Sequence, residues 1–242
     1  MSRLQPENTG DNTGQADSQK RLALLENWLR SLTDFAFTDL RPTSSDASFR
    51  RYFRVDRVHD ARSLIVMDAP PELEDIGPFL HVTGLLRDAG VHAPEILAQD
   101  TGRGFVLLSD LGDIPYLDAL DDDTAETLYG DAISALVNMQ QIEDGLPHYD
   151  AGRLQAEMDL FEPWYLNRHL GIELDAGQRG ELEKIFALLI ESALSQPQVF
   201  VHRDYHSRNL MLVDEINPGV IDYQDAVIGP VTYDLVSLFK DC

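Results

Sequence analysis

The sequence predicts an α+β fold of two lobes, because strand-like and helix-like patterns fall in different parts of the chain. Between residues 40 and 110, short runs rich in aromatic and β-branched residues alternate with polar turns, as expected for an antiparallel sheet. After residue 110 the apolar residues recur at helical spacing. The helices expected there cover residues 123–142, 154–170 and 178–195. We therefore expect an N-terminal lobe built from a sheet plus a helix, followed by a mostly helical C-terminal lobe.

The lobe boundaries follow from the same change in composition. Residues 1–18 are almost entirely polar, so we expect a disordered tail there. The N-terminal lobe then covers residues 19–110 and begins with an amphipathic helix over 19–32. A second helix, over residues 77–89, falls within the same lobe. The C-terminal lobe covers residues 111–242.

The charge of the chain narrows the classes of partner. Its 242 residues include 19 basic and 42 acidic side chains, a net charge of −23. Such a surface repels phosphate backbones and anionic lipid, so we expect neither nucleic acid nor a membrane as a partner. The one cysteine, Cys242, leaves no internal disulfide, and the sequence contains no apolar run of about 20 residues and no signal-peptide core. These features predict a cytoplasmic protein, whose oligomeric state the sequence does not reveal.

The polar segment His202–Asn209 carries the strongest chemical signal. It contains an acid, Asp204, and an amide five residues later, Asn209; a further apolar run ends in a second acid, Asp222. A carboxylate such as Asp204 can orient a hydroxyl group and accept its proton. An amide oxygen and a second carboxylate can hold Mg²⁺ against the phosphates of a nucleotide. We therefore predict that Asp204 is catalytic and that Asn209 and Asp222 are magnesium ligands of a kinase.

Two details around this segment distinguish classes of kinase. The sequence resembles the aminoglycoside phosphotransferase and choline-kinase branch of the protein-kinase-like fold, because His206 stands two residues after Asp204, where protein kinases usually carry lysine. Only eleven residues separate Asp222 from Asp234, which is too short for the long activation segment of protein kinases. The resemblance implies ATP and Mg²⁺ as cofactors and a small molecule as the acceptor. It also implies a nucleotide-binding N-terminal lobe and a catalytic, acceptor-binding C-terminal lobe.

Three further stretches, Asp46–Arg54, Val66–Glu72 and Ile221–Ala226, are similar to those of bacterial anomeric sugar kinases. Those enzymes phosphorylate N-acetylmuramate and N-acetylglucosamine at C1 in cell-wall recycling, so the resemblance implies a sugar acceptor. Two alternatives stay open on the sequence. One is an aminoglycoside or choline-like acceptor, and the other is a nucleotide-binding regulator with little or no catalysis.

The sequence also departs from the kinase pattern. Met67 stands where the third strand usually supplies a lysine for the nucleotide phosphates, and the helix at 78–88 contains no glutamate to pair with it. We expect a nearby arginine to replace the lysine, with Arg50 preferred over Arg51 and Arg54. Relatives of this kind continue with further helices after the Asp234 helix. We therefore expect the chain to be a fragment that lacks part of its acceptor wall.

The remaining site residues are predicted from their positions beside these motifs. The polar loop before the second strand lacks glycine, so Ser45 and Ser48, together with Arg50, are expected to contact phosphate, while backbone groups of Leu108 and Asp110 are expected at the adenine edge. His202, His206 and Asp234 are expected to support the catalytic loop. The candidates for contact with the acceptor are Arg203, Tyr205, Gln224, Asp225, Glu157 and Trp164.

Overall fold

The computed structural model describes residues 11–32, 36–37, 39–45, 49–58 and 63–241, with the side chains of residues 11–17 and 44–45 excepted. Contacts between these residues divide them into two units. The first contains the described residues up to Ile76 together with Glu95–Asp110, and the second contains Gly77–Pro94 and the described residues from Leu111 onward.

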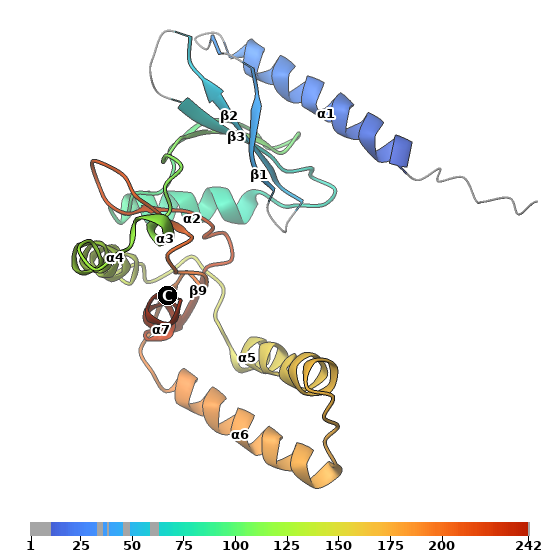
Figure 1. The fold of residues 1–242 in the computed structure, drawn as a ribbon, viewed down its shortest axis with the longest axis vertical. Helices are drawn as coiled ribbons and strands as arrows, with labels where there is room; N and C mark the ends of the chain where they lie inside the picture. Colours follow the sequence, from blue (N-terminus) through green and yellow to red (C-terminus); the bar gives the residue numbers. More distant parts are fainter. Residues whose placement is uncertain (1–10, 33–35, 38, 46–48, 59–62, 242) are drawn as a thin grey trace, which may run out of the picture. The chain divides into compact units, whose positions relative to one another are not determined.

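The first unit is an antiparallel sheet with one helix across it (Figure 1). The strands follow the order β1-β2-β3-β5-β4. Their bounds are β1 (Arg41–Ser45), β2 (Arg51–Asp56), β3 (Ser63–Asp68), β4 (Ile96–Asp100) and β5 (Phe105–Ser109). Strand β5 is paired on both sides and reads as a continuous apolar run, Phe-Val-Leu-Leu, because an inner strand beneath a helix has little exposure to water.

Helix α1 (Asp11–Ser31) covers one face of this sheet. Its Leu25, Trp28 and Leu29 are spaced three or four residues apart and pack into the core of the unit against Phe53 and Phe105. The helix begins at Asp11, so the prediction of a tail over residues 1–18 is corrected for residues 11–18. Polar residues can extend a helix once its apolar part is docked, because each added residue gains a backbone hydrogen bond.

The second unit is mostly helical and carries two short strand pairs. Strand β6 (Gln198–Val201) pairs antiparallel with β9 (Val227–Pro230), and β7 (Leu210–Met211) pairs with β8 (Gly219–Val220). The helical elements are α2 (Gly77–Asp88), α3 (Tyr116–Ala119), α4 (Ala125–Met139), α5 (Ala151–Met158), the π-helix η1 (Phe161–His169), α6 (Ala176–Leu194) and α7 (Tyr233–Lys240). The predicted α+β architecture, with a sheet first and helices after it, is confirmed.

Helix α2 groups with the second unit, whereas the sequence analysis placed it in the N-terminal lobe. Its Phe79 ring stacks on Tyr223 with the centroids 5.4 Å apart, and the Thr83 hydroxyl lies 2.8 Å from the Tyr223 hydroxyl. Just after the helix, the carbonyl of His92 accepts a hydrogen bond from Val220 N–H at 2.9 Å. The apolar face of α2 was predicted from its periodicity, but the element that this face packs against is 140 residues away in sequence.

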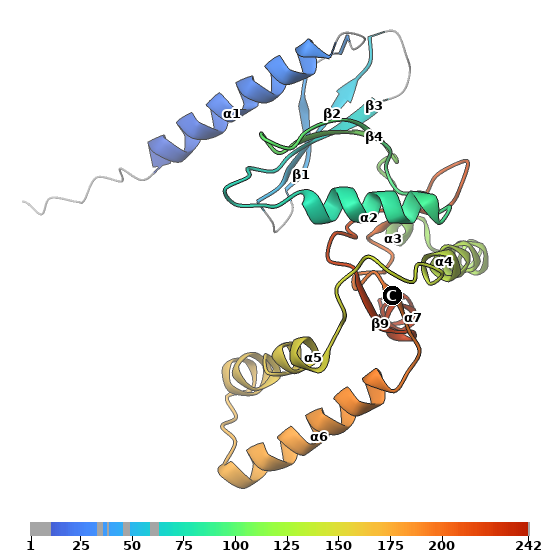
Figure 2. The same ribbon diagram turned by 180° about the vertical axis from the view of Figure 1, so that it is seen from behind.

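The segment predicted as one helix over 154–170 forms two elements. Helix α5 ends at Met158, and η1 begins at Phe161 (Figure 2). Pro163 lies in the first turn of η1, where a backbone N–H would have no intrahelical partner, so the proline costs no hydrogen bond. Helices α5 and α6 lie side by side and share a small core that includes Leu154 and Ile190. Among the helices of the described residues, none is both long enough and apolar enough to cross a bilayer.

Candidate active site

The loop His202–Asn209 follows β6 and is held in an unusual backbone conformation. Arg203 and Asp222 have positive φ angles, 79° and 66°, although neither is glycine. Residues other than glycine adopt this region only where the surrounding structure holds them there. Asp234, at the start of α7, provides one such restraint, because its carboxylate accepts the backbone N–H groups of His202 at 2.7 Å and Arg203 at 3.0 Å. The predicted supporting position of Asp234 therefore has a direct physical basis.

Asp234 and His202 are both buried, and burial shifts both pKa values. Burial raises the pKa of Asp234 from its ordinary 3.8 to about 7, against the effect of the two N–H groups that it accepts. Burial lowers the pKa of His202 to about 3, so its imidazole is neutral at physiological pH. The His202 Nε2 atom lies 3.1 Å from the carbonyl oxygen of Ile221 and must donate to it. A neutral donor of this kind links the catalytic loop to the residue before Asp222.

The prediction for Tyr205 is wrong. This residue was predicted to contact the acceptor, but its side chain is completely buried and its hydroxyl donates to the carbonyl of Ala132 at 2.7 Å. Its ring also packs edge-on against His202. Tyr205 therefore anchors the loop in the core of the second unit, because a large aromatic side chain beside an exposed acid can point inward while the acid points outward.

Asn209 and Asp222 are brought together as the sequence predicted they would be. The Nδ2 atom of Asn209 donates to the backbone carbonyl of Asp204 at 3.0 Å and lies 3.5 Å from Asp222 Oδ2. The carbonyl of Asn209 accepts the N–H of Ile221 at 3.1 Å, which holds the two chain segments side by side. Because Nδ2 is used to fix the side chain, the amide oxygen remains available to bind a metal ion. One neutral oxygen and one carboxylate form a donor set that fits a magnesium ion shared with phosphate oxygens.

Asp204 is exposed beside this pair. Its pKa lies above the ordinary value, first because of partial burial and then because of the negative charge of Asp222, while His206 and Arg203 act in the opposite direction. A carboxylate made more basic by its surroundings is better suited to accept a proton from a hydroxyl group. The local geometry therefore fits a residue that orients an attacking hydroxyl.

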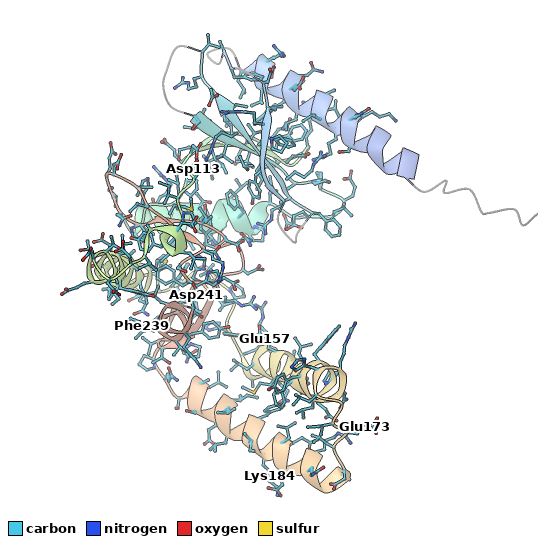
Figure 3. The ribbon with its side chains drawn as sticks, viewed as in Figure 1. Asp113, Glu157, Glu173, Lys184, Phe239 and Asp241 are labelled. Carbon is cyan, nitrogen blue, oxygen red and sulfur yellow. The ribbon has the colours of Figure 1, made fainter. Side chains whose placement is uncertain are left out.

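Some of the predicted acceptor residues are paired with other side chains, and the others are exposed. Arg203 is paired with Glu157 at 2.7 Å, and Glu157 also accepts a hydrogen bond from the Tyr149 hydroxyl. Figure 3 shows Glu157 on α5. Gln224 donates to Asp222 Oδ1 at 3.0 Å, which makes it a support of the predicted metal ligand. Asp225 is exposed near Gln224. Trp164 is 56% exposed on η1, with the guanidinium of Arg168 4.8 Å above its ring.

The predicted nucleotide residues lie in the first unit. Arg50 is 6% exposed, and its Nε lies 3.4 Å from a carboxylate oxygen of Glu74. Ser48 lies outside the described residues, and only the backbone of Ser45 is described, at the end of β1. Leu108 is an inner residue of β5, paired with both β3 and β4.

Other arginines of the first unit are paired with buried acids. Arg54 forms an ion pair with the side chain of Asp110 at 2.6 Å. Arg51 pairs with Asp68, whose carboxylate is completely buried. Met67, at the position where a kinase lysine is expected, is also completely buried. The structure therefore assigns separate acidic partners to the three candidate arginines.

Sequence reasoning missed two contributors to these networks. Glu74 was not singled out as the partner of Arg50, although it precedes α2, where a kinase glutamate is sought. Asp241 was also missed, and it contacts Ser207 and Arg208 of the catalytic loop. Its spacing of seven residues from Asp234, which places the two acids on one face of a helix, is the signal that could have revealed it.

Comparison with known proteins identifies the family. A sequence model of the phosphotransferase enzyme family (APH) matches residues 39–242. The chain belongs to the phosphotransferase enzyme family. This membership confirms the resemblance to aminoglycoside phosphotransferases inferred from the catalytic loop.

Curated relatives of this chain that are named N-acetylmuramate/N-acetylglucosamine kinase include proteins of two Pseudomonas species. The protein of Pseudomonas aeruginosa is 55% identical over 205 residues, which cover 84% of this chain and 60% of that protein. The protein of Pseudomonas putida is 47% identical over 233 residues, covering 91% of this chain and 68% of that protein. The chain thus spans about three-fifths to two-thirds of the length of these relatives.

Solved structures of phosphotransferases share the fold. An aminoglycoside phosphotransferase with ADP bound has a TM-score of 0.63 at 16% identity, covering 91% of this chain and 76% of that one. A choline kinase from Streptococcus pneumoniae has a TM-score of 0.64 at 13% identity, covering 90% and 73%. The predicted protein-kinase-like fold is therefore confirmed.

Proposed function

We propose that this chain carries the catalytic residues of an ATP-dependent kinase that phosphorylates the anomeric hydroxyl of N-acetylmuramate or N-acetylglucosamine. The observation that carries the proposal is the exposed Asp204 carboxylate beside the Asn209–Asp222 pair, in a loop whose backbone is held by Asp234. The names of the two Pseudomonas relatives support the sugar acceptor.

In the proposed reaction, Asp204 accepts a hydrogen bond from the acceptor hydroxyl and aligns its oxygen with the γ-phosphorus of ATP. A new oxygen–phosphorus bond forms, the bond between that phosphorus and the β,γ-bridging oxygen breaks, and ADP leaves. The proton of the hydroxyl passes to Asp204 and then to solvent. Asn209 and Asp222 would hold a magnesium ion, which neutralises charge on the phosphates when it is bound.

The residues that replace the missing lysine and glutamate form part of the same proposal. We propose that Arg50 contacts the nucleotide phosphates and that Glu74 orients it, as the glutamate of a kinase helix orients the lysine. The observation that supports this assignment is the Arg50–Glu74 separation of 3.4 Å. A guanidinium can bind two phosphate oxygens at once, which suits this substitution.

The test is a coupled assay of ADP release with Mg²⁺, ATP and each of a panel of acceptors. N-acetylmuramate and N-acetylglucosamine should support turnover, whereas an aminoglycoside and choline should not. Asp204→Ala should lower turnover by about 10²–10⁴-fold while ATP still raises the unfolding temperature. Turnover only with the cationic acceptors would contradict the sugar assignment. Magnesium-dependent ATP binding without turnover on any acceptor would favour the regulator.

A further inference from the structure

Asp241, at the C-terminal end of α7, contacts the middle of the catalytic loop. Its Oδ2 accepts the backbone N–H of Ser207 at 3.0 Å and also the Ser207 hydroxyl. Its other oxygen, Oδ1, accepts from the guanidinium of Arg208 at 2.7 Å. The Asp241 side chain is 9% exposed, so its contacts to Ser207 are largely shielded from water, whereas the side chain of Arg208 is 58% exposed.

The contacts of Asp241 favour the charged form of its carboxylate. Burial raises the pKa of Asp241, but hydrogen bonds from Ser207 and the charges of His206 and Arg208 outweigh burial, so the pKa lies below its ordinary value. The contacts to the loop therefore stabilise the Asp241 carboxylate against the cost of burial.

Asp234 and Asp241 together hold both sides of the catalytic acid. They lie seven residues apart, about two helical turns, and so project from the same face of α7. Asp234 accepts the N–H groups of His202 and Arg203, which precede Asp204. Asp241 accepts the N–H of Ser207, which follows it. The exposed acid thus stands between two restraints supplied by one helix.

We propose that Asp241 is a positioning residue that fixes Asp204 by restraining the loop on its C-terminal side. The proposal rests on the proposed function for its kinetic consequence, but the restraint itself is independent of which molecule is phosphorylated. Because displacement of a catalytic group by about 1 Å can cost about a hundredfold in rate, loss of this restraint is expected to lower turnover more than substrate binding.

The experiment compares Asp241→Ala and Asp241→Asn with wild type and with a control, Lys240→Ala, which removes an exposed charge from the adjacent residue. Asp241→Ala is expected to lower kcat by about ten- to hundredfold, with the KM for ATP changed less than threefold. Asp241→Asn keeps an acceptor oxygen for Ser207 N–H and should recover most of the loss. Lys240→Ala should behave as wild type. An unchanged kcat in Asp241→Ala, or an equal loss in the Asn and Ala variants, would overturn the proposal.

A second measurement does not depend on turnover. Amide hydrogen exchange should accelerate at Ser207 and Arg208 in Asp241→Ala, while exchange in the first unit stays as in wild type. If exchange accelerates in Asp241→Ala but the wild-type protein does not phosphorylate either sugar, the proposed function is contradicted and the restraint is supported. Unchanged exchange at Ser207 would overturn the restraint even in an active enzyme. If Asp241→Ala does not fold, Asp241→Asn and Ser207→Ala, which removes only the hydroxyl donor, allow the same comparison with smaller expected effects.

Discussion

Replacing Asp234 by asparagine tests how the catalytic loop is held. Asp234 is 1% exposed and accepts two backbone N–H groups, at 2.7 and 3.0 Å. Asparagine has the same shape but only one acceptor oxygen, so its NH₂ group must face one of the two N–H groups. A buried donor left without an acceptor costs about 1–3 kcal/mol. At pH 5, where wild-type Asp234 is mostly protonated, we expect Asp234→Asn to be less stable than wild type by about that amount.

The difference in stability between wild type and Asp234→Asn should shrink as the pH rises. Because the pKa of Asp234 is raised in the folded protein to about 7 from an ordinary 3.8, the folded state holds a proton that the unfolded state releases between these values. The stability contributed by Asp234 is complete below pH 4 and is lost as the pH rises through 7. At about 1.4 kcal/mol per pKa unit, wild type should lose about 2 kcal/mol relative to the variant between pH 5 and pH 7.

The assay is urea unfolding of both proteins at pH 5, 6 and 7. His202 also titrates on unfolding, and because its folded pKa is lowered to about 3, its contribution is present above pH 6.5 and lost toward pH 3. This opposite slope is common to both proteins and cancels in their difference. Asp214→Asn, in an exposed turn, is the control and should follow wild type. A stability gap that stays constant or widens from pH 5 to pH 7 would refute the reasoning.

Two further predictions concern the nucleotide residues and α2. Arg50→Ala should raise the KM for ATP by about tenfold or more, and Glu74→Gln should raise it by a smaller factor. Both changes would be measured from the kinetics of ADP release. An unchanged KM for ATP in Arg50→Ala would show that another cation contacts the phosphates. Thr83→Val should lower the free energy of unfolding by about 1–3 kcal/mol because the buried hydrogen bond between the Thr83 and Tyr223 hydroxyls is lost, and Thr83→Val combined with Tyr223→Phe should cost less than the sum of the two single losses. Strictly additive losses in urea unfolding would exclude this coupling.

The sequence by itself determined the chemistry of the catalytic loop. Asp204 and Asn209 are five residues apart, and Asp222 follows one short strand pair, so their proximity depends mostly on local backbone geometry. The α+β order of elements was also predictable, because the periodicity of apolar residues is a local property. In the structure, the side chain of Asn209 contacts the backbone of Asp204 and lies near Asp222, as their spacing in the sequence predicted.

Only the tertiary structure decided which partners these residues have. Tyr205 was expected at the acceptor and is instead buried against Ala132, 73 residues away. Arg203 meets Glu157 across 46 residues, and Ser207 meets Asp241 across 34.

Spacing along the chain reveals which residues share a helix face or a strand end, but not what packs against that face. The packing partner is set by the burial of apolar surface over the whole unit. For this reason the sequence predicted the phosphoryl-transfer loop and the support from Asp234, whereas the structure was needed to find that Asp241 contacts the other side of the loop.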